Sequence, residues 1–265
     1  MPAVELARLQ QEAAQLSEHF ADPQTYLRAV EKLLQAYSVT IHRQGRVRGL
    51  RPVLLSYEVP PPLLKQIQLE MAMQAKQYPQ RALDIADALW ARRTVETRLL
   101  AARLLGHIPI EDTNEITKRL QAWALENREE FLVPELSGAS TLYLCQKDPN
   151  ALVAFAAKFI LSDEPRQQIL ALGALQTLLA NNHFENLPAI FAVLASLTAD
   201  PTKKLRLYLA DLLAVLAQRS PKETLYFLQQ RLAESPGNET QWVARQVLRS
   251  FPEDERQQLR QALRP

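Results

Sequence analysis

Apolar residues recur at helical spacing along almost all of this 265-residue chain, and this periodicity restricts its fold more than any other feature. Between residues 200 and 219, leucines fall at positions 205, 209, 212, 213 and 216, which is one stripe of an amphipathic helix. The breaks between such segments are Asp-Pro, Ser-Pro or Asn, and the chain has six glycines. Because sheets need more turns than this, the pattern predicts an all-α protein.

Prolines and capping residues predict where the helices begin. Asp200 is expected to cap one helix with Pro201 at its first position, and Ser220, Pro221 and Glu223 have the spacing of a capping box for the next. The same signals predict helices at about residues 2–20, 23–37, 60–77, 79–90, 93–106, 112–126, 134–146, 149–161, 164–180, 186–198, 201–219, 221–234, 239–250 and 252–263.

From about residue 60 onward the predicted helices pair off, and corresponding helices return about every 33 to 40 residues. Such pairs bury their apolar faces only by stacking on one another. The sequence therefore predicts a single HEAT-like repeat α-solenoid over residues 1–265, a curved superhelix with a concave inner layer. Residues 1–59 are expected to form an N-terminal helix pair and a basic loop, and residues 60–265 the helix-pair array.

Several classes of protein are disfavoured by composition. A single cysteine, Cys145, excludes an intramolecular disulfide framework, fits a reducing compartment and is expected to be buried. The N-terminus lacks the pattern of a signal peptide, and the most apolar run, residues 151–161, is too short to span a membrane. A cytoplasmic protein without membrane contact is the expectation.

Cofactor chemistry is not indicated either. No glycine-rich phosphate-binding loop and no GxSxG motif occurs in the sequence. The histidines do not have the spacing of metal ligands; they are His19, His42, His107 and His183. We therefore expect neither a metal nor a cofactor.

The formal net charge of +2 is too small to indicate a nucleic-acid partner, so the local placement of cations has to carry that inference. A loop with two glycines holds four arginines within nine residues: Arg43, Arg46, Arg48 and Arg51. A phosphate backbone would be attracted to such a loop. The alternative is a solvated loop whose arginines pair with acids on neighbouring helices.

Further cations lie on the second helix of successive predicted pairs. They are Arg98, Arg166, Lys203, Arg206, Arg245 and Arg249. Where such residues are three or four apart they share one side of a helix. If these helices line the concave layer, their cations converge on a groove; otherwise they only face solvent.

The segment from Leu89 to Pro109 combines apolar spacing with charge. Four of its leucines are expected to form the seam between helices: Leu99, Leu100, Leu104 and Leu105. Glu96 and Arg98 are interpreted as solubilising or repeat-linking groups. The tryptophans Trp90, Trp123 and Trp242 are interpreted as packing residues before functional ones.

Several short stretches of the sequence, in the order in which they occur, resemble those of a known protein family. They are Val47-Arg48-Gly49, Pro62 to Ile67, Leu89-Trp90, Glu96 to Ala101, Asp163-Glu164-Pro165, and Leu212 to Ala217 leading into Phe227-Leu228. Together they are similar to the DNA alkylation repair proteins of the AlkD type, which are HEAT-like repeat DNA glycosylases. The resemblance covers roughly residues 45 to 250.

The resemblance implies excision of cationic alkylated purines by a carboxylate that is flanked by tryptophans and supported by an arginine. When the chains are matched at Lys147-Asp148-Pro149, the family's Trp-Trp-Asp segment falls on residues 129–134, which contain no tryptophan. The carboxylate position is Pro134, next to Glu135, and the arginine position is Ile169, one turn from Arg166. The later groove tryptophan falls on Asp211.

Three functional hypotheses follow. The first is a non-catalytic member of this family that binds duplex DNA or another polyanion in a concave cationic groove. The second is an alkylpurine DNA glycosylase that uses Glu135 and Arg166. The third is a scaffold whose groove holds a partner protein helix.

Overall fold

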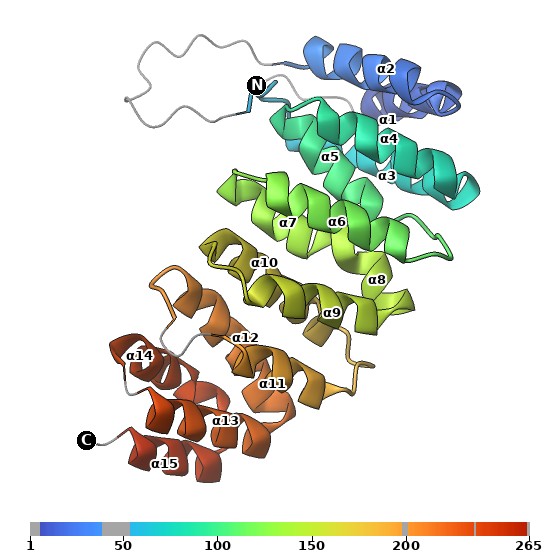
Figure 1. Cartoon of the computed structure of the whole chain (residues 1–265). Coiled ribbons are helices and arrows are strands. Elements are labelled where there is room, and N and C mark those ends of the chain that lie inside the picture. Colours follow the sequence, from blue (N-terminus) through green and yellow to red (C-terminus); the bar gives the residue numbers. More distant parts are fainter. Residues whose placement is uncertain (1–5, 39–53, 198–200, 236, 264–265) are drawn as a thin grey trace, which may run out of the picture. The chain divides into compact units, whose positions relative to one another are not determined.

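The computed structural model describes residues 6–38, 54–197, 201–235 and 237–263, and regular structure within these ranges is helical (Figure 1), with one isolated bridge between Leu55 and Thr94. The all-α prediction is confirmed. The α-helices are α1 (Leu6–Ala14), α2 (Pro23–Ala36), α3 (Pro61–Gln77), α4 (Pro79–Ala91), α5 (Val95–Leu105), α6 (Asn114–Glu126), α7 (Val133–Ser137), α8 (Leu142–Lys147), α9 (Pro149–Ile160), α10 (Pro165–Ala180), α11 (Leu187–Ala195), α12 (Leu205–Arg219), α13 (Pro221–Glu234), α14 (Asn238–Val247) and α15 (Glu253–Ala262). Short 3-10 helices are η1 (Gln15–His19), η2 (Glu130–Leu132), η3 (Ala139–Thr141) and η4 (Leu248–Ser250).

The chain forms two compact units. Unit 1 contains the residues up to Leu120 together with Glu126–Tyr143, and unit 2 contains Gln121–Leu125 together with the residues from Leu144 onward. The division runs through α6 and α8, so each unit is described by itself.

Each unit has two layers, and neighbours within a layer are two helices apart along the chain. In unit 1, α1 packs on α3 and α3 on α5, while α2 packs on α4 in the other layer. In unit 2, α10, α12 and α14 follow one another in one layer, while α9 packs on α11 and α13 on α15 in the other. This is the contact pattern of stacked helix pairs (Figure 1).

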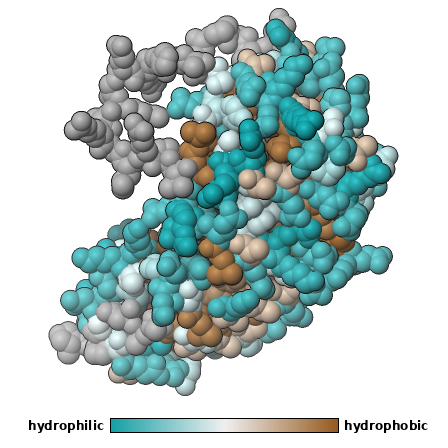
Figure 2. All heavy atoms as spheres, turned by 45° about the horizontal axis from the view of Figure 1, so that its top comes forward, coloured by the Kyte–Doolittle hydropathy of each residue, from teal (hydrophilic) through white to brown (hydrophobic). Residues whose placement is uncertain are grey.

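Buried leucines hold these layers together. The predicted stripe of α12 is confirmed, because its five leucines at positions 205, 209, 212, 213 and 216 are at most 7% exposed. In α5, Leu100, Leu104 and Leu105 are buried as well, while Leu99 is partly exposed. Cys145 is a buried free thiol, as predicted. The outer surface drawn in Figure 2 is mainly hydrophilic, and hydrophobic residues reach it in places.

One predicted helix start and one predicted helix cap need correction. Helix α12 begins at Leu205 rather than at Pro201; Thr202 Oγ1 accepts the Leu205 amide at 3.4 Å, and Asp200 lies outside the described residues. Ser220 precedes α13 as predicted, but its hydroxyl lies 2.6 Å from a Glu223 carboxylate oxygen instead of capping a backbone amide. A hydroxyl that donates to a carboxylate is not free to serve as the backbone cap.

Polar contacts link each repeat to the next at a nearly constant separation in the sequence. Their partners are 32 to 40 residues apart in the pairs Arg103–Glu135, Arg119–Asp87, Tyr143–Ile110, Trp90–Glu126, Asn181–Cys145, Arg206–Glu239, Arg231–Leu197 and Arg219–Leu179. This separation is close to the predicted repeat of 33 to 40 residues, and two of the pairs lie one residue below it. Some charged side chains, among them Arg103, Arg119 and Arg206, therefore connect helices about one predicted repeat apart.

Glu96 and Arg98 show the same use of charge inside α5. Glu96 is 3% and Arg98 2% exposed, so a solubilising role is wrong and a linking role is supported. Glu96 Oε1 accepts hydrogen bonds from the Ser56 hydroxyl at 2.8 Å and from the Glu58 amide at 2.9 Å. These bonds attach the segment after residue 53 to the start of α5.

In the described part of the chain, no helix combines the length and the apolar character needed to cross a membrane. Among the same residues, no group of three or more His, Cys, Asp or Glu side chains is arranged to hold a metal ion.

Candidate nucleic-acid interface

The predicted basic loop cannot be assigned a geometry. Its four arginines, Arg43, Arg46, Arg48 and Arg51, lie outside the described residues. The candidate interface is therefore built from the helical cations alone.

Arg98 is buried in unit 1 and contacts Trp90 and Glu126, a group of three residues that we call the Trp90 cluster. Its guanidinium carbon is 4.4 Å from the centre of the Trp90 ring, and Nη2 donates to Glu126 Oε1 at 2.5 Å. The Trp90 indole N–H donates to the other Glu126 oxygen at 2.9 Å. With 3% of its side chain exposed, Arg98 does not present its charge to solvent in this conformation.

Arg206 takes part in a similar group in unit 2, the Trp242 cluster, which contains Arg206, Glu239 and Trp242. The guanidinium carbon lies 4.3 Å from the Trp242 ring centre, and Nη1 donates to Glu239 Oε2 at 2.6 Å. The side chain of Arg206 is 27% exposed, and Trp242 is only partly buried. Unlike the guanidinium of Arg98, that of Arg206 therefore reaches solvent.

Three exposed cations of unit 2 lie within seven residues of a member of this cluster. Trp242, Arg245 and Arg249 are at i, i+3 and i+7, so they lie along one side of α14 and η4. Arg245 donates to the neutral side-chain oxygen of Gln241 at 2.9 Å. Lys203 is exposed in the turn before α12, three residues from Arg206. Within the described ranges no carboxylate forms an ion pair with Arg245, Arg249 or Lys203, so these three charges are uncompensated.

Arg166 belongs to the same layer of helices. It lies in the first turn of α10, and its Nη2 is 3.5 Å from Glu164 Oε2. Because α10, α12 and α14 are successive members of one layer, Arg166, Lys203, Arg206, Arg245 and Arg249 all come from that layer or its adjoining turns. Exposed cations of this kind attract a phosphate backbone.

Glu135, the alternative catalytic carboxylate, is held by an arginine. It lies in the first turn of α7, and its two oxygens accept from Arg103 Nε at 3.0 Å and Nη2 at 2.6 Å. This hydrogen bonding raises the pKa of Arg103 above its ordinary value although burial opposes it. A carboxylate neutralised on both oxygens is poorly placed to stabilise a positively charged sugar.

Close packing of the chain fixes this pair. A Cβ atom on Gly106, at the end of α5, would lie 1.8 Å from the Ala139 carbonyl oxygen. A residue with a side chain would therefore push the end of α5 away from η3. Arg103 lies one turn before Gly106. The close approach of Gly106 to Ala139 therefore fits the short distance between Arg103 and Glu135.

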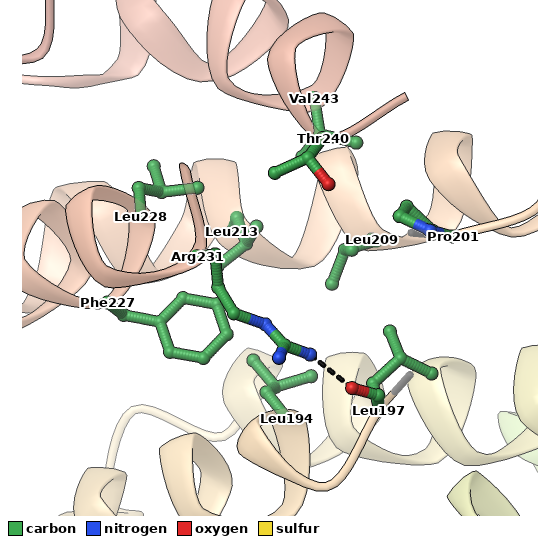
Figure 3. A pocket seen from close by; sticks show the side chains of 10 residues that line it. All are labelled: Leu194, Leu197, Pro201, Leu209, Leu213, Phe227, Leu228, Arg231, Thr240 and Val243. Atoms are coloured by element: carbon green, nitrogen blue, oxygen red, sulfur yellow. Dashed lines mark hydrogen bonds between the residues drawn. The ribbon is translucent and has the colours of Figure 1, made fainter. Parts of the chain in front are cut away.

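A small cavity between helices of unit 2 is not suited to a ligand. It has a volume of about 20 Å³, enough for one water molecule, and its walls come from α11, α12, α13 and α14 (Figure 3). Arg231 reaches across it and donates to the Leu197 carbonyl oxygen, with its guanidinium 5.8 Å from the Phe227 ring (Figure 3). The buried Leu209 also lines it. The cavity is part of the packing of unit 2.

Sequence reasoning missed the partners of these residues. The sequence pattern favours a packing role for Trp242, and it does not identify Arg103 or Glu239 as site residues. A usable signal was present, because Arg206 and Glu239 are 33 residues apart and Arg103 and Glu135 are 32 apart, close to one repeat. Opposite charges at that separation would have pointed to both pairs.

The contacts described above define an all-helical protein of stacked helix pairs with an exposed cationic layer in its second unit. The chain belongs to the DNA alkylation repair enzyme family, whose model matches residues 53–259. No curated protein and no solved structure matches it. The resemblance inferred from the sequence is thus confirmed for the family, and family membership connects the chain with a function on DNA.

Proposed function

We propose that this chain is a HEAT-like α-solenoid that binds duplex DNA through its backbone and does not excise bases. The observation that carries this proposal is the set of cations on the α10–α12–α14 layer, which also contains the partly exposed Trp242 cluster. Lys203, Arg245 and Arg249 supply uncompensated charge there, and Arg206 adds a guanidinium stacked on an indole. Arg98 is not included, because it is buried in unit 1.

Helix geometry adds to this attraction. Arg166, Lys203 and Arg206 lie at the N-terminal ends of α10 and α12, where the helix dipoles are positive. The Arg206–Glu239 bond places the start of α14 beside the start of α12. Side chains and helix ends therefore favour an anion at the same place. A phosphate backbone is a suitable ligand, and one whose binding weakens steeply with salt.

A salt titration tests the binding. We expect fluorescence anisotropy with labelled duplex DNA to give a steep negative slope of log affinity against log salt. The double variant Arg245→Glu/Arg249→Glu should weaken binding by at least about tenfold and make the slope shallower by about 2. Lys118→Glu is the matched control, because Lys118 is 71% exposed on α6 in unit 1. No binding at low salt, or an equal loss in both variants, would contradict the proposal.

The arginines of the predicted basic loop are tested separately. A variant with Arg48→Glu and Arg51→Glu measures their contribution without touching α14. If this variant loses all binding while the Arg245/Arg249 variant retains it, the interface belongs to the loop instead of the helical layer.

Glycosylase activity is the alternative that family membership favours. Its residues would be Glu135 and Arg166, and the bidentate contact between Arg103 and Glu135 argues against it. Release of 7-methylguanine from methylated DNA distinguishes the two functions. Release by the wild-type protein that is lost in Glu135→Gln would replace the non-catalytic proposal, whereas binding without release supports it.

A further inference from the structure

The Arg206–Glu239 pair is joined by fewer hydrogen bonds than the other arginine–carboxylate pairs that connect described helices 28 to 33 residues apart. In those pairs the carboxylate accepts at least two hydrogen bonds; they are Arg98–Glu126, Arg103–Glu135 and Arg119–Asp87. Glu239 accepts one, from Arg206 Nη1 at 2.6 Å, and within the described part of the chain its other oxygen accepts none. A carboxylate held by one such bond is easier to displace than one held by two.

The guanidinium of Arg206 has donors that the protein does not use. Its Nε atom is buried without a hydrogen-bond partner, and among the described residues Glu239 is the acceptor for Nη1. A guanidinium has five N–H donors, so most of those on Arg206 are left over. The side chain is 27% exposed, whereas that of Arg98, which lies over an indole in the same way, is 3% exposed. An anion in solvent can therefore reach Arg206.

Glu239 neutralises a cation of the layer for which we propose DNA binding. Three exposed cations of that layer or its adjoining turns have no carboxylate partner within the described ranges, namely Lys203, Arg245 and Arg249. Arg206 differs from them because Glu239 compensates its charge. Asp211, the carboxylate of α12, is exposed five residues further along the helix and does not pair with Arg206. The contact with Glu239 is therefore what limits the use of Arg206 by a phosphate.

We propose that Glu239 is an internal competitor of the DNA backbone: its carboxylate holds Arg206 in the free protein, and a phosphate takes its place when duplex DNA binds. This inference rests on the proposed DNA binding by the α10–α12–α14 layer. Carboxylate and phosphate oxygens accept hydrogen bonds from a guanidinium in similar geometry, so Arg206 can exchange one for the other while it stays over Trp242. Because Glu239 loses its partner in this exchange, it lowers the affinity of the wild-type protein for DNA.

Glu239→Gln tests the competition, because the amide keeps an oxygen for Arg206 and removes the negative charge. We expect labelled duplex DNA to bind about fivefold more tightly in fluorescence anisotropy. The slope of log affinity against log salt should become steeper by up to about 1, since no cation is taken up at Glu239 in exchange. Glu223→Gln is the matched control, because it removes the same charge from an exposed position on α13, in the other layer. An equal gain in both variants, or no gain in Glu239→Gln, would overturn the proposal.

A double-mutant cycle separates exchange at Arg206 from simple repulsion of DNA by Glu239. In an Arg206→Ala background, Glu239→Gln should raise the affinity by at most about twofold, because no guanidinium is left to be released. The gain should therefore depend on the presence of Arg206. If Glu239→Gln raises the affinity equally with and without Arg206, Glu239 only repels DNA and the proposed exchange is wrong.

Thermal unfolding separates competition from a structural role, because the same ion pair connects α12 with α14. Competition predicts that Glu239→Gln binds DNA more tightly while its melting temperature falls slightly or stays the same. If Glu239 serves only to connect the two helices, affinity should stay the same or fall together with stability. That result would contradict the proposal.

DNA binding and the role of Glu239 can fail separately. If wild type and Glu239→Gln bind DNA equally, the proposed function stands and the competition is wrong. If neither binds at low salt, both are wrong. Binding by Glu239→Gln without binding by wild type would support the competition and would show that the wild-type protein does not perform the proposed function on plain duplex DNA.

Discussion

The Trp90 and Trp242 clusters contain the same three residue types in similar geometry but in different surroundings. In both, an arginine lies over an indole at 4.3–4.4 Å and donates to a glutamate. The Trp90 cluster joins α4, α5 and α6, and its arginine is 3% exposed. The Trp242 cluster joins α12 and α14, and its arginine is 27% exposed.

This difference in burial changes what the same contacts can do. The Arg98 guanidinium has two hydrogen-bond partners. Its Nη2 donates to Glu126, and its Nε donates to the Trp90 carbonyl oxygen at 3.3 Å. Around Arg206 the Nε atom has no hydrogen-bond partner, and cations lie beside the ring. An arginine stacked on a tryptophan is therefore not by itself a sign of ligand binding. Such a pair can contact a ligand only where the arginine is exposed to solvent.

Removing the tryptophans should separate the two clusters most strongly. Trp90 is 4% exposed, so Trp90→Ala should lower the free energy of unfolding by about 3–5 kcal/mol. Trp242 is partly exposed, so Trp242→Ala should cost about 1–2 kcal/mol and mainly weaken DNA binding. Urea unfolding followed by circular dichroism measures the first effect, and anisotropy the second. Equal losses of stability would contradict the distinction.

Removing the arginines should give a smaller difference of the same kind. Arg98→Ala takes away a buried guanidinium, but Glu126 is 47% exposed and can be hydrated, so we expect a loss of about 2–3 kcal/mol. Arg206→Ala should cost about 1 kcal/mol, because its ion pair is partly solvated, and should weaken DNA binding severalfold. A variant of Arg98 that unfolds like wild type but fails to bind DNA would reverse the assignment of the two clusters.

The periodic features of this fold were accessible from sequence. Leucine spacing and prolines located the helices, because burial on one side of a helix repeats every three or four residues. The pattern predicts the start of α12 four residues too early, because Lys203 and Lys204 form a turn between Pro201 and the helix. A proline signals the neighbourhood of a helix start without fixing its first residue.

The fate of individual charges was much harder to predict. Arg98 and Arg206 have similar local patterns, each a cation within a leucine-rich helix. Their different exposure depends on the next helix, where Glu126 ends α6 and closes over Arg98, while Glu239 begins α14 beside Arg206. A single helix pattern contains no information about that neighbour. The helices could therefore be predicted from the sequence, whereas the exposure of each charged side chain could not.

Acid titration of the Trp90 cluster gives the smallest expected effect. Burial alone would raise the pKa of Glu126, but the indole hydrogen bond from Trp90 and the positive charge of Arg98 outweigh it and hold the pKa below the ordinary 4.5. A carboxyl with a lowered pKa stabilises the folded state above its unfolded pKa and loses that contribution as pH falls through the folded pKa. Because Glu126 is about half exposed, the contribution should be below about 1 kcal/mol.

Trp90→Phe isolates this contribution, because it keeps an aromatic ring under Arg98 and removes the indole N–H. The stability difference between wild type and Trp90→Phe should shrink as pH is lowered from about 6 towards 3, when Glu126 becomes protonated in both proteins. Glu126→Gln is the control, since a side chain that does not titrate should abolish this pH dependence. If the Trp90→Phe difference stays constant across the range, the lost packing of the larger ring accounts for it, and the hydrogen bond from Trp90 does not stabilise the ionised carboxylate.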